Sequence, residues 1–208
     1  MCETRRPRRY CLGIRGEICT VCCGTEREMT VDCPPACEFL LEARKHERLA
    51  PLDPAAIPNR DLRITDELLS ENQDLLLVLI EALLTAVEES PSVVDFDARE
   101  ALDAAIRTYR TLESGLYYES LPDNPLAAGL ARAMLSAVEE FRREETERLG
   151  MTHTRDSAVL SVLVLLQHIE LDRNNGRRKG RSFLHFLMQL YPSMSDGDSA
   201  GTSSLVLP

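Results

Sequence analysis

Residues 18–37 read Ile-Cys-Thr-Val-Cys-Cys-Gly-Thr-Glu-Arg-Glu-Met-Thr-Val-Asp-Cys-Pro-Pro-Ala-Cys, and this stretch decides how the N-terminal part of the chain folds. It holds five of the seven cysteines in the 208-residue sequence. Cys2 and Cys11 precede it, and residues 38–208 contain no cysteine. Such clustering indicates metal ligation rather than scattered core thiols, provided that the compartment keeps thiols reduced.

The first thiol pair in this stretch is Cys19 and Cys22, which lie across a predicted tight turn. Gly24 follows two residues after Cys22 and can take the positive φ that such a turn often needs. Nine residues separate Cys23 from the next cysteine. That length allows a short hairpin, with residues 28–31 as its expected return strand.

The second thiol pair is Cys33 and Cys37, which flank two prolines before a predicted helix over residues 38–44. Proline suits the first turn of a helix because the N–H group that it lacks has no partner there. A thiol pair on a turn followed by another at a helix start is a common way to build a tetrahedral zinc site. The predicted ligands are therefore Cys19, Cys22, Cys33 and Cys37.

Cys11 and Cys23 leave the ligand set open. Cys22 and Cys23 are adjacent and compete for one position, unless Cys11 and Cys23 help to bind a second ion. A closed shell of four cysteines has no position for water, so zinc would be structural and would supply folding free energy to a segment with few large apolar side chains. An iron–sulfur cluster uses the same ligands and is the alternative cofactor.

A thiol pair on a hairpin, followed by a second pair at a helix start, resembles treble-clef and zinc-ribbon modules over about residues 10–45. Residues 18–27 together with Cys33-Pro-Pro-Ala-Cys37 also resemble the opening of a group of uncharacterised bacterial proteins in which a helical domain follows. Both resemblances imply a metal-binding module, and neither implies a substrate. Cys23 departs from the simple Cys-x-x-Cys-Gly pattern.

After the cysteines, the sequence predicts a mainly α fold with an antiparallel bundle of four to five helices. Leu, Ala, Glu and Arg dominate, aromatic residues make up 5%, and Trp is absent, which favours helices around an aliphatic core. The expected N-caps are Thr65 or Asp66, Asp97 and Asn124. The predicted helices cover residues 65–89, 97–118, 124–150, 154–172 and 182–190.

The expected domain limits follow from these patterns. Residues 1–49 form a cysteine-rich metal-binding module, 50–63 a linker with three prolines, 64–192 the bundle, and 193–208 a disordered tail rich in Ser, Asp and Gly. The longest apolar stretches, 75–80 and 158–166, fall far short of the roughly 20 residues that cross a bilayer. No stretch has the pattern of a signal peptide, so we expect a cytoplasmic protein without a membrane partner.

The net charge of −10 comes from residues 51–150, where 21 acidic side chains face nine basic ones. This excess disfavours broad nucleic-acid binding by the bundle. Two basic runs remain, residues 5–9 and the loop 173–181 before the last helix. Backbone amides and basic side chains of that loop form a candidate anion or nucleic-acid site, with the residues Arg173, Arg177, Arg178, Lys179 and Arg181.

No combination of nucleophile, base and orienting group can be assembled from the sequence, so no catalytic residue is predicted. The favoured hypothesis is a non-enzymatic, zinc-stabilised protein that binds another protein. The first alternative is a nucleic-acid-binding or transcription-regulatory protein that uses the two basic runs. The second is an iron–sulfur or redox protein.

Overall fold

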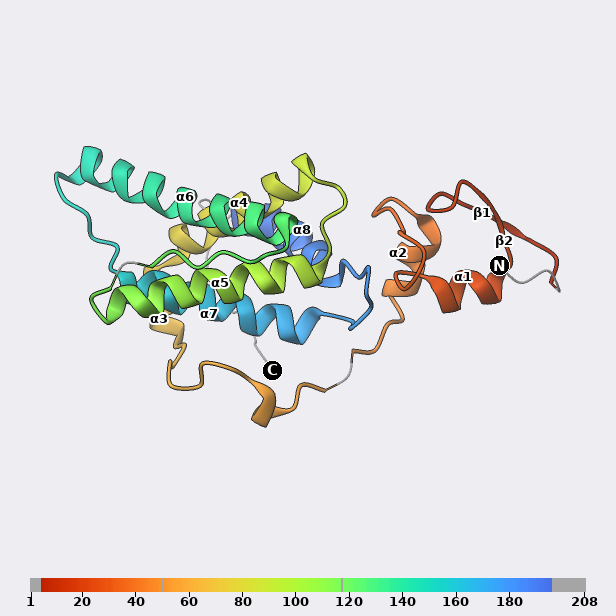
Figure 1. The fold of residues 1–208 in the computed structure, drawn as a ribbon, viewed down its shortest axis with the longest axis horizontal. Coiled ribbons are helices and arrows are strands. Elements are labelled where there is room, and N and C mark those ends of the chain that lie inside the picture. Colours follow the sequence, from red (N-terminus) through yellow and green to blue (C-terminus); the bar gives the residue numbers. More distant parts are fainter. Residues whose placement is uncertain (1–4, 50, 117, 196–208) are drawn as a thin grey trace.

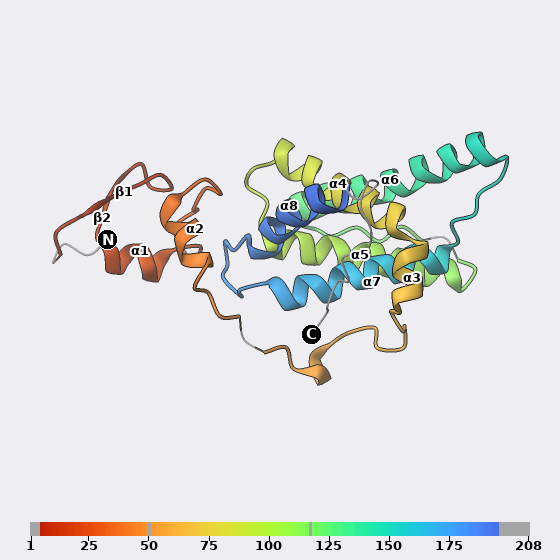
Figure 2. The same cartoon turned by 180° about the vertical axis from the view of Figure 1, so that it is seen from behind.

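The computed structural model describes residues 5–49, 51–116 and 118–195, and most of them are helical. A small N-terminal module lies beside a larger helical bundle, and an extended segment joins the two (Figure 1). The view from behind gives the same arrangement (Figure 2). The expected fold class, a short hairpin with a helix followed by a helical bundle, is confirmed.

The cysteine module, which we define as residues 5–49, contains two strands and two short helices. Strand β1 (Arg9–Cys11) pairs antiparallel with β2 (Gly16–Ile18), and Tyr10 lies opposite Glu17. The helices are α1 (Thr20–Glu26) and α2 (Glu38–Arg44), of which α2 occupies the predicted residues.

The tight turn predicted at residues 19–24 and the hairpin predicted after Cys23 were wrong, because residues 20–26 are helical and the hairpin lies earlier in the chain. Cys19 is the N-cap of α1, and its Sγ accepts the backbone N–H of Cys22 at 3.3 Å. A capped start lets residues 20–26 satisfy their backbone groups locally, so Gly24 lies inside a helix without a positive φ. The expected return strand, residues 28–31, contributes only an isolated bridge between Arg27 and Val31.

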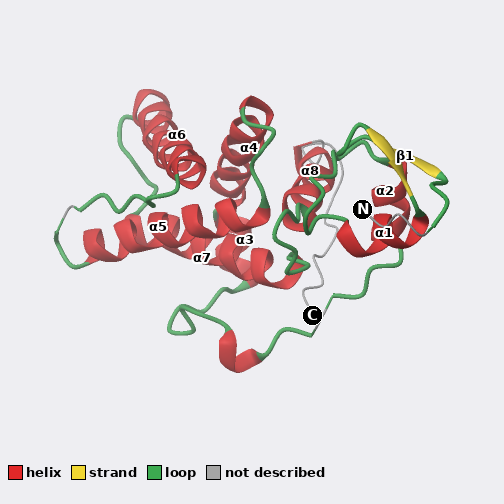
Figure 3. Cartoon of the chain, turned by 45° about the vertical axis from the view of Figure 1, so that its right-hand side comes forward, coloured by secondary structure: helices red, strands yellow, loops and turns green. Residues whose placement is uncertain are grey.

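Six helices form the bundle, and their packing defines its core. Helix α5 packs against α6 and α7, while α4 packs against α6 and α8. Colouring by secondary structure separates this all-helical part from the module with its two strands (Figure 3). The six helices are α3 (Asp66–Glu71), α4 (Gln73–Glu89), α5 (Asp95–Glu113), α6 (Pro125–Leu149), α7 (Asp156–Arg173) and α8 (Ser182–Ser195).

The bundle core is aliphatic, as the composition predicted. Residues 159–167 of α7 are buried without a gap, so this helix is surrounded by protein along that stretch. Helix α4 contributes six buried apolar side chains, and Phe183 of α8 is fully buried against them. The module has a separate, smaller core around Ile18, Val31 and Leu40.

Helix boundaries differ from prediction at four main places. Helix α5 ends at Glu113 rather than at residue 118, because the chain turns at Ser114 and Gly115. The expected helix 65–89 is interrupted at Asn72, whose side chain donates to the carbonyl of Leu68 and ends α3. Thr65 caps α3 as expected. Helix α5 begins at Asp95, so Asp97 is not its N-cap but accepts the N–H of Val94 at 2.8 Å. The last helix continues to Ser195.

The segment expected to be a linker is tied to the bundle. Asn59 donates to Gln167 of α7 at 2.8 Å and accepts from Arg110 of α5 at 3.1 Å. Arg110 also forms an ion pair with Asp61 at 2.7 Å, and a ring nitrogen of His168 lies 2.9 Å from the Pro58 carbonyl. Residues 58–61 therefore act as a strap across α5 and α7.

Two other expectations concern the ends of elements. Asn124 caps α6 as predicted, accepting the N–H of Leu126 at 3.1 Å with Pro125 in the first turn. Residues 196–208 of the predicted tail lie outside the described residues. Within the described part of the chain, no helix combines the length and hydropathy needed to cross a membrane.

Candidate functional site

Four cysteines from separate parts of the module lie in one buried group, which we call the thiol cluster. Cys11 ends β1, Cys23 lies on α1, Cys33 lies in the loop between the helices, and Cys37 is the N-cap of α2. All four are thiols rather than disulfides, and none is more than 9% exposed. The cluster therefore joins β1, α1, the loop between the helices and the start of α2.

Burial and the neighbouring thiols act together on Cys33. Burial raises the pKa of Cys33, the backbone N–H of Glu28 opposes that change, and the neighbouring Cys37 and Cys11 raise it further. Gly13 leaves no space between the hairpin and this loop, because a Cβ there would lie 2.3 Å from the Asp32 carbonyl oxygen. The hairpin, the loop and α2 thus converge on Cys33.

A positive charge adjoins the cluster. Nη1 of Arg9 lies 3.9 Å from Sγ of Cys23, and its guanidinium stacks on the ring of Phe39 at 4.3 Å. Arg9 thus lies between the sulfur of Cys23 and the first turn of α2. One arginine of the expected nucleic-acid arm therefore belongs to the module itself.

The predicted zinc ligands are only partly gathered. Cys33 and Cys37 lie in the thiol cluster, Cys22 packs against it half-buried, and Cys19 is buried as the cap of α1. Cys11 and Cys23, the two less certain ligands, lie inside the cluster. Across residues 5–49, 51–116 and 118–195, no three Cys, His, Asp or Glu side chains are placed to hold a metal ion. Soft thiol donors suit zinc or iron, but these sulfurs do not form a coordination shell.

Glu28 lies beside the cluster and joins the module to the bundle. It has a positive φ of 54° and is 1% exposed. Its carboxylate accepts from Nη2 of Arg44 at 2.8 Å, from Nδ2 of Asn175 at 3.0 Å and from the N–H of Arg181 at 3.3 Å. A buried carboxylate with three donors is well compensated, and two of those donors come from the bundle side.

The loop predicted to bind an anion is mostly engaged with the module. We call residues 174–181 the junction loop. The Arg177 guanidinium donates to the Arg27 carbonyl at 2.6 Å, and Lys179 donates its backbone N–H to the Glu28 carbonyl at 2.7 Å. Nζ of Lys179 also donates to the carbonyl of Thr30 at 3.0 Å.

Arg181 completes this junction from a position that is 5% exposed. Its guanidinium donates to Asp32 of the module at 2.6 Å and to the carbonyls of Val93 and Pro91, which connect α4 and α5. Of the five predicted anion-binding residues, Arg178 is exposed, and Arg173 stacks on Phe186 and pairs with Asp172. The loop's cations thus serve mainly to hold the two parts together.

Asp95 supports the junction from inside the bundle. Its carboxylate accepts the N–H groups of Phe183 at 3.0 Å and Leu184 at 3.1 Å, at the start of α8, and it is 1% exposed. Burial raises the pKa of Asp95 to about 6, against the opposing effect of these two hydrogen bonds. The backbone N–H of Asp95 donates to the carbonyl of Gly180. A side chain at position 180 would collide with Asn175.

The raised pKa of Asp95 predicts a pH-dependent stability. The native state binds this proton more tightly than the unfolded chain, so the stabilisation is complete below about pH 4 and is lost as the pH rises through about 6. We expect Asp95→Asn to lack this decline, so that its free energy of unfolding gains on wild type by about 2 kcal/mol between pH 4 and 7. Urea unfolding followed by circular dichroism at several pH values measures the difference. Parallel pH profiles for the two proteins would contradict the assignment.

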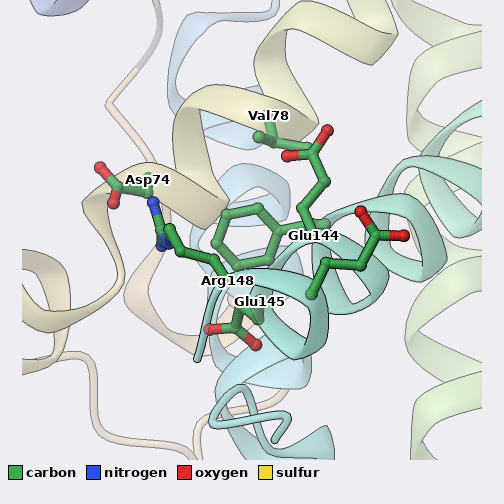
Figure 4. Close-up of a pocket in the computed structure, with 7 residues that line it drawn as sticks. Asp74, Val78, Glu144, Glu145 and Arg148 are labelled. Carbon is green, nitrogen blue, oxygen red and sulfur yellow. The ribbon is translucent and has the colours of Figure 1, made fainter. Parts of the chain in front are cut away.

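A separate pocket of about 520 Å³ lies between α4 and α6. Arg148 extends toward Asp74 across it, while Glu144 and Val78 lie at its other side (Figure 4). Glu145 also lines it, but its carboxylate is held by the N–H and hydroxyl of Thr154 at 3.0 and 2.9 Å. Burial alone would raise the pKa of Glu145, and these hydrogen bonds with that from His153 lower it instead. The acidic lining opposes binding of phosphate or carboxylate.

Comparison with known proteins adds no assignment to this geometry. No family matches. No curated protein and no solved structure is similar to the chain either.

Two important residues had no clear signal in the sequence. Glu28 is one of several acidic residues in the module, and only the fold shows that it is buried. Arg44 was recognised only as part of a predicted helix. The sequence contains a basic loop and a module with several acidic residues. Their spacing along the chain does not show which acidic residue contacts the loop.

Proposed function

We propose that this protein is a non-enzymatic interaction protein whose cysteine module is stabilised by structural zinc and is presented to another protein by the helical bundle. The observation that best supports this proposal is that the thiol cluster adjoins Glu28 through Cys33. The backbone N–H of Glu28 points to Cys33 and its carboxylate reaches the junction loop. An ion held by these thiolates would fix the loop between α1 and α2, whose Glu28 attaches the module to the junction loop.

The module's own composition supports a need for an ion. Its core contains four cysteines and only three larger buried aliphatic side chains, so hydrophobic burial provides little stability. Zinc bound by cysteines supplies folding free energy directly, and a full thiolate shell leaves no position for a substrate. The cytoplasm, where thiols stay reduced, is the compartment in which such a site would load.

The module's surface supports a protein partner. Large apolar side chains are exposed on β1, on the turn that follows it, on both helices and on the loop between the helices. Covering exposed apolar side chains with another protein removes them from water, which favours association. They are Tyr10, Leu12, Val21, Met29 and Leu41, with exposed fractions between 37% and 61%.

A nucleic-acid role receives less support. Arg177, Lys179 and Arg181 are committed to the module, and Arg9 is committed to Cys23 and Phe39. Only short exposed runs of basic side chains remain for phosphates, next to a bundle with a large acidic excess.

The test is metal analysis of the full chain purified without oxygen, together with its absorption spectrum. We expect one zinc per chain and no visible absorbance. A brown protein with bound iron would favour the iron–sulfur alternative. Apo protein that keeps a folded module would overturn the proposal.

Matched variants identify the ligand set. If the thiol cluster binds the ion, Cys23→Ser should lose zinc and Cys19→Ser should keep it. The opposite result would assign the ion to Cys19, Cys22, Cys33 and Cys37. Loss in both variants would indicate a second ion, which elemental stoichiometry of the wild type reports independently.

A further inference from the structure

The stretch from Arg5 to Glu17 gathers positive charge on the module. We call it the basic hairpin, because it contains β1 and β2. Its half-buried Arg9 is engaged with Cys23 and Phe39. The other charged side chains of the hairpin are one exposed glutamate and four exposed arginines, and these arginines form no ion pair with the residues that the structure describes. They are Arg5, Arg6, Arg8 and Arg15.

Two large apolar side chains lie among these arginines. Tyr10 of β1 is 61% exposed, and Leu12 in the turn after β1 is 51% exposed. Neither side chain belongs to the core of the module. Such a surface suits an acidic partner surface that also offers apolar contacts.

The pocket between α4 and α6 has that composition, and we call it the acidic pocket. Its apolar lining consists of the half-buried side chains of Val78 and Phe141. Four carboxylates share the lining with one cation, Arg148, which extends toward Asp74 (Figure 4). Directly after Arg148, Leu149 and Met151 are 50% and 60% exposed. The carboxylates are those of Asp74, Glu144, Glu145 and Glu147.

The basic hairpin and the acidic pocket lie at opposite ends of the molecule. The hairpin forms the far end of the module, and the pocket lies beside the end of α6 that points away from the module (Figure 1, Figure 2). The bundle separates the two, so a hairpin can meet such a pocket only on another copy of the chain. The net charge of −10 makes copies repel each other in most orientations, whereas this contact brings opposite local charges together.

We propose that the basic hairpin of one copy docks in the acidic pocket of a second copy, with its arginines on the carboxylates and with Tyr10 and Leu12 against the apolar lining. The contact is heterologous, because a hairpin meets a pocket rather than another hairpin. Each copy has one hairpin and one pocket at opposite ends, so two antiparallel copies make the contact twice. The second copy is then the protein partner in the proposed function, on whose protein-binding role this contact rests, and zinc is not required for it.

The test is sedimentation velocity of the full chain over a series of protein concentrations, at about 0.05 M and about 0.5 M salt. We expect association that increases with protein concentration and weakens by about tenfold or more at the higher salt, because the contact depends on exposed charges. Protein that stays monomeric at every concentration, with or without bound nucleic acid, would overturn the proposal. Association that is insensitive to salt would also overturn it.

Two charge reversals test the pairing itself. The hairpin variant carries Arg6→Glu and Arg8→Glu, and the pocket variant carries Glu144→Lys and Glu147→Lys, all at exposed positions. Each variant alone should be monomeric and folded by circular dichroism, since the change brings like charges together at the contact. An equimolar mixture should associate again, because the reversed hairpin of one variant matches the reversed pocket of the other. A monomeric mixture, or a single variant that associates like wild type, would contradict the contact.

A control variant and the metal content separate this contact from other effects. Glu113→Lys with Glu119→Lys changes the net charge by the same amount at exposed positions that do not line the pocket, and it should associate like wild type. Loss of association in this control would assign the effect to net charge and overturn the proposal. A monomer that binds zinc would overturn the contact and leave the zinc proposal intact, whereas an associating protein without metal would do the reverse.

Discussion

Replacing Glu28 by alanine should detach the cysteine module from the bundle and lower the free energy of unfolding by about 3–5 kcal/mol. The change removes the only carboxylate that pairs with Arg44 among the described residues, and leaves that arginine buried with its charge uncompensated. It also removes the acceptor for Asn175 and for the N–H of Arg181. Both alanine and glutamate carry a Cβ, so the strain of φ 54° is common to the two proteins.

Glu42→Ala is the matched control for this prediction. Glu42 lies on the same helix as Arg44 and pairs with Lys45 and His46, but its side chain is 62% exposed. Exposed pairs of this kind contribute little, so its unfolding curve should coincide with that of wild type. Urea unfolding by circular dichroism compares all three proteins. A Glu28→Ala curve that also coincides with wild type would refute the role of Glu28 in joining the module to the bundle.

Removing the proposed ion should unfold the module and spare the bundle. After prolonged treatment with a strong chelator and a reductant, we expect hydrogen exchange to become fast in α1 and α2, because their helices are too short to persist alone. Residues 75–87 of α4 and 159–166 of α7 belong to a separate core and should keep their protection. These helices are the internal control within each sample.

The same experiment has a clear contrary outcome. If α1 and α2 keep their protection after chelation, and no metal is found before it, then the module holds together through packing of its thiols alone. The zinc proposal would then be wrong, while the role of Glu28 in joining the module to the bundle would remain testable by the Glu28→Ala variant.

Local signals were enough to predict much of the fold. The apolar stretch 75–80, the Asn124-Pro125 start and the helix after Cys37 depend on interactions within a few residues, and each appears where expected. Helix boundaries were predicted wrongly where a side chain competes with the backbone for a hydrogen-bond acceptor. Asn72 ends α3 by bonding to Leu68, and no periodicity of apolar residues reveals such a bond.

The candidate site was harder to predict because it depends on contacts across long stretches of chain. Spacing favoured Cys19 and Cys22, whereas helix α1 turns Cys23 into the core and uses Cys19 as a cap. The role of the basic loop could not be deduced either. Its acceptors, the carbonyls of Arg27, Glu28 and Thr30, are about 150 residues away in sequence, and backbone carbonyls leave no trace in residue types.

The strap at residues 58–61 has a kinetic consequence for the junction. Asn59 and Asp61 anchor the chain on α5 and α7 independently of Glu28. A module that dissociates from the bundle therefore stays tethered close to its docking surface. Recapture is then a unimolecular event at an effective local concentration in the millimolar range. Opening should therefore be brief, reversible and insensitive to dilution.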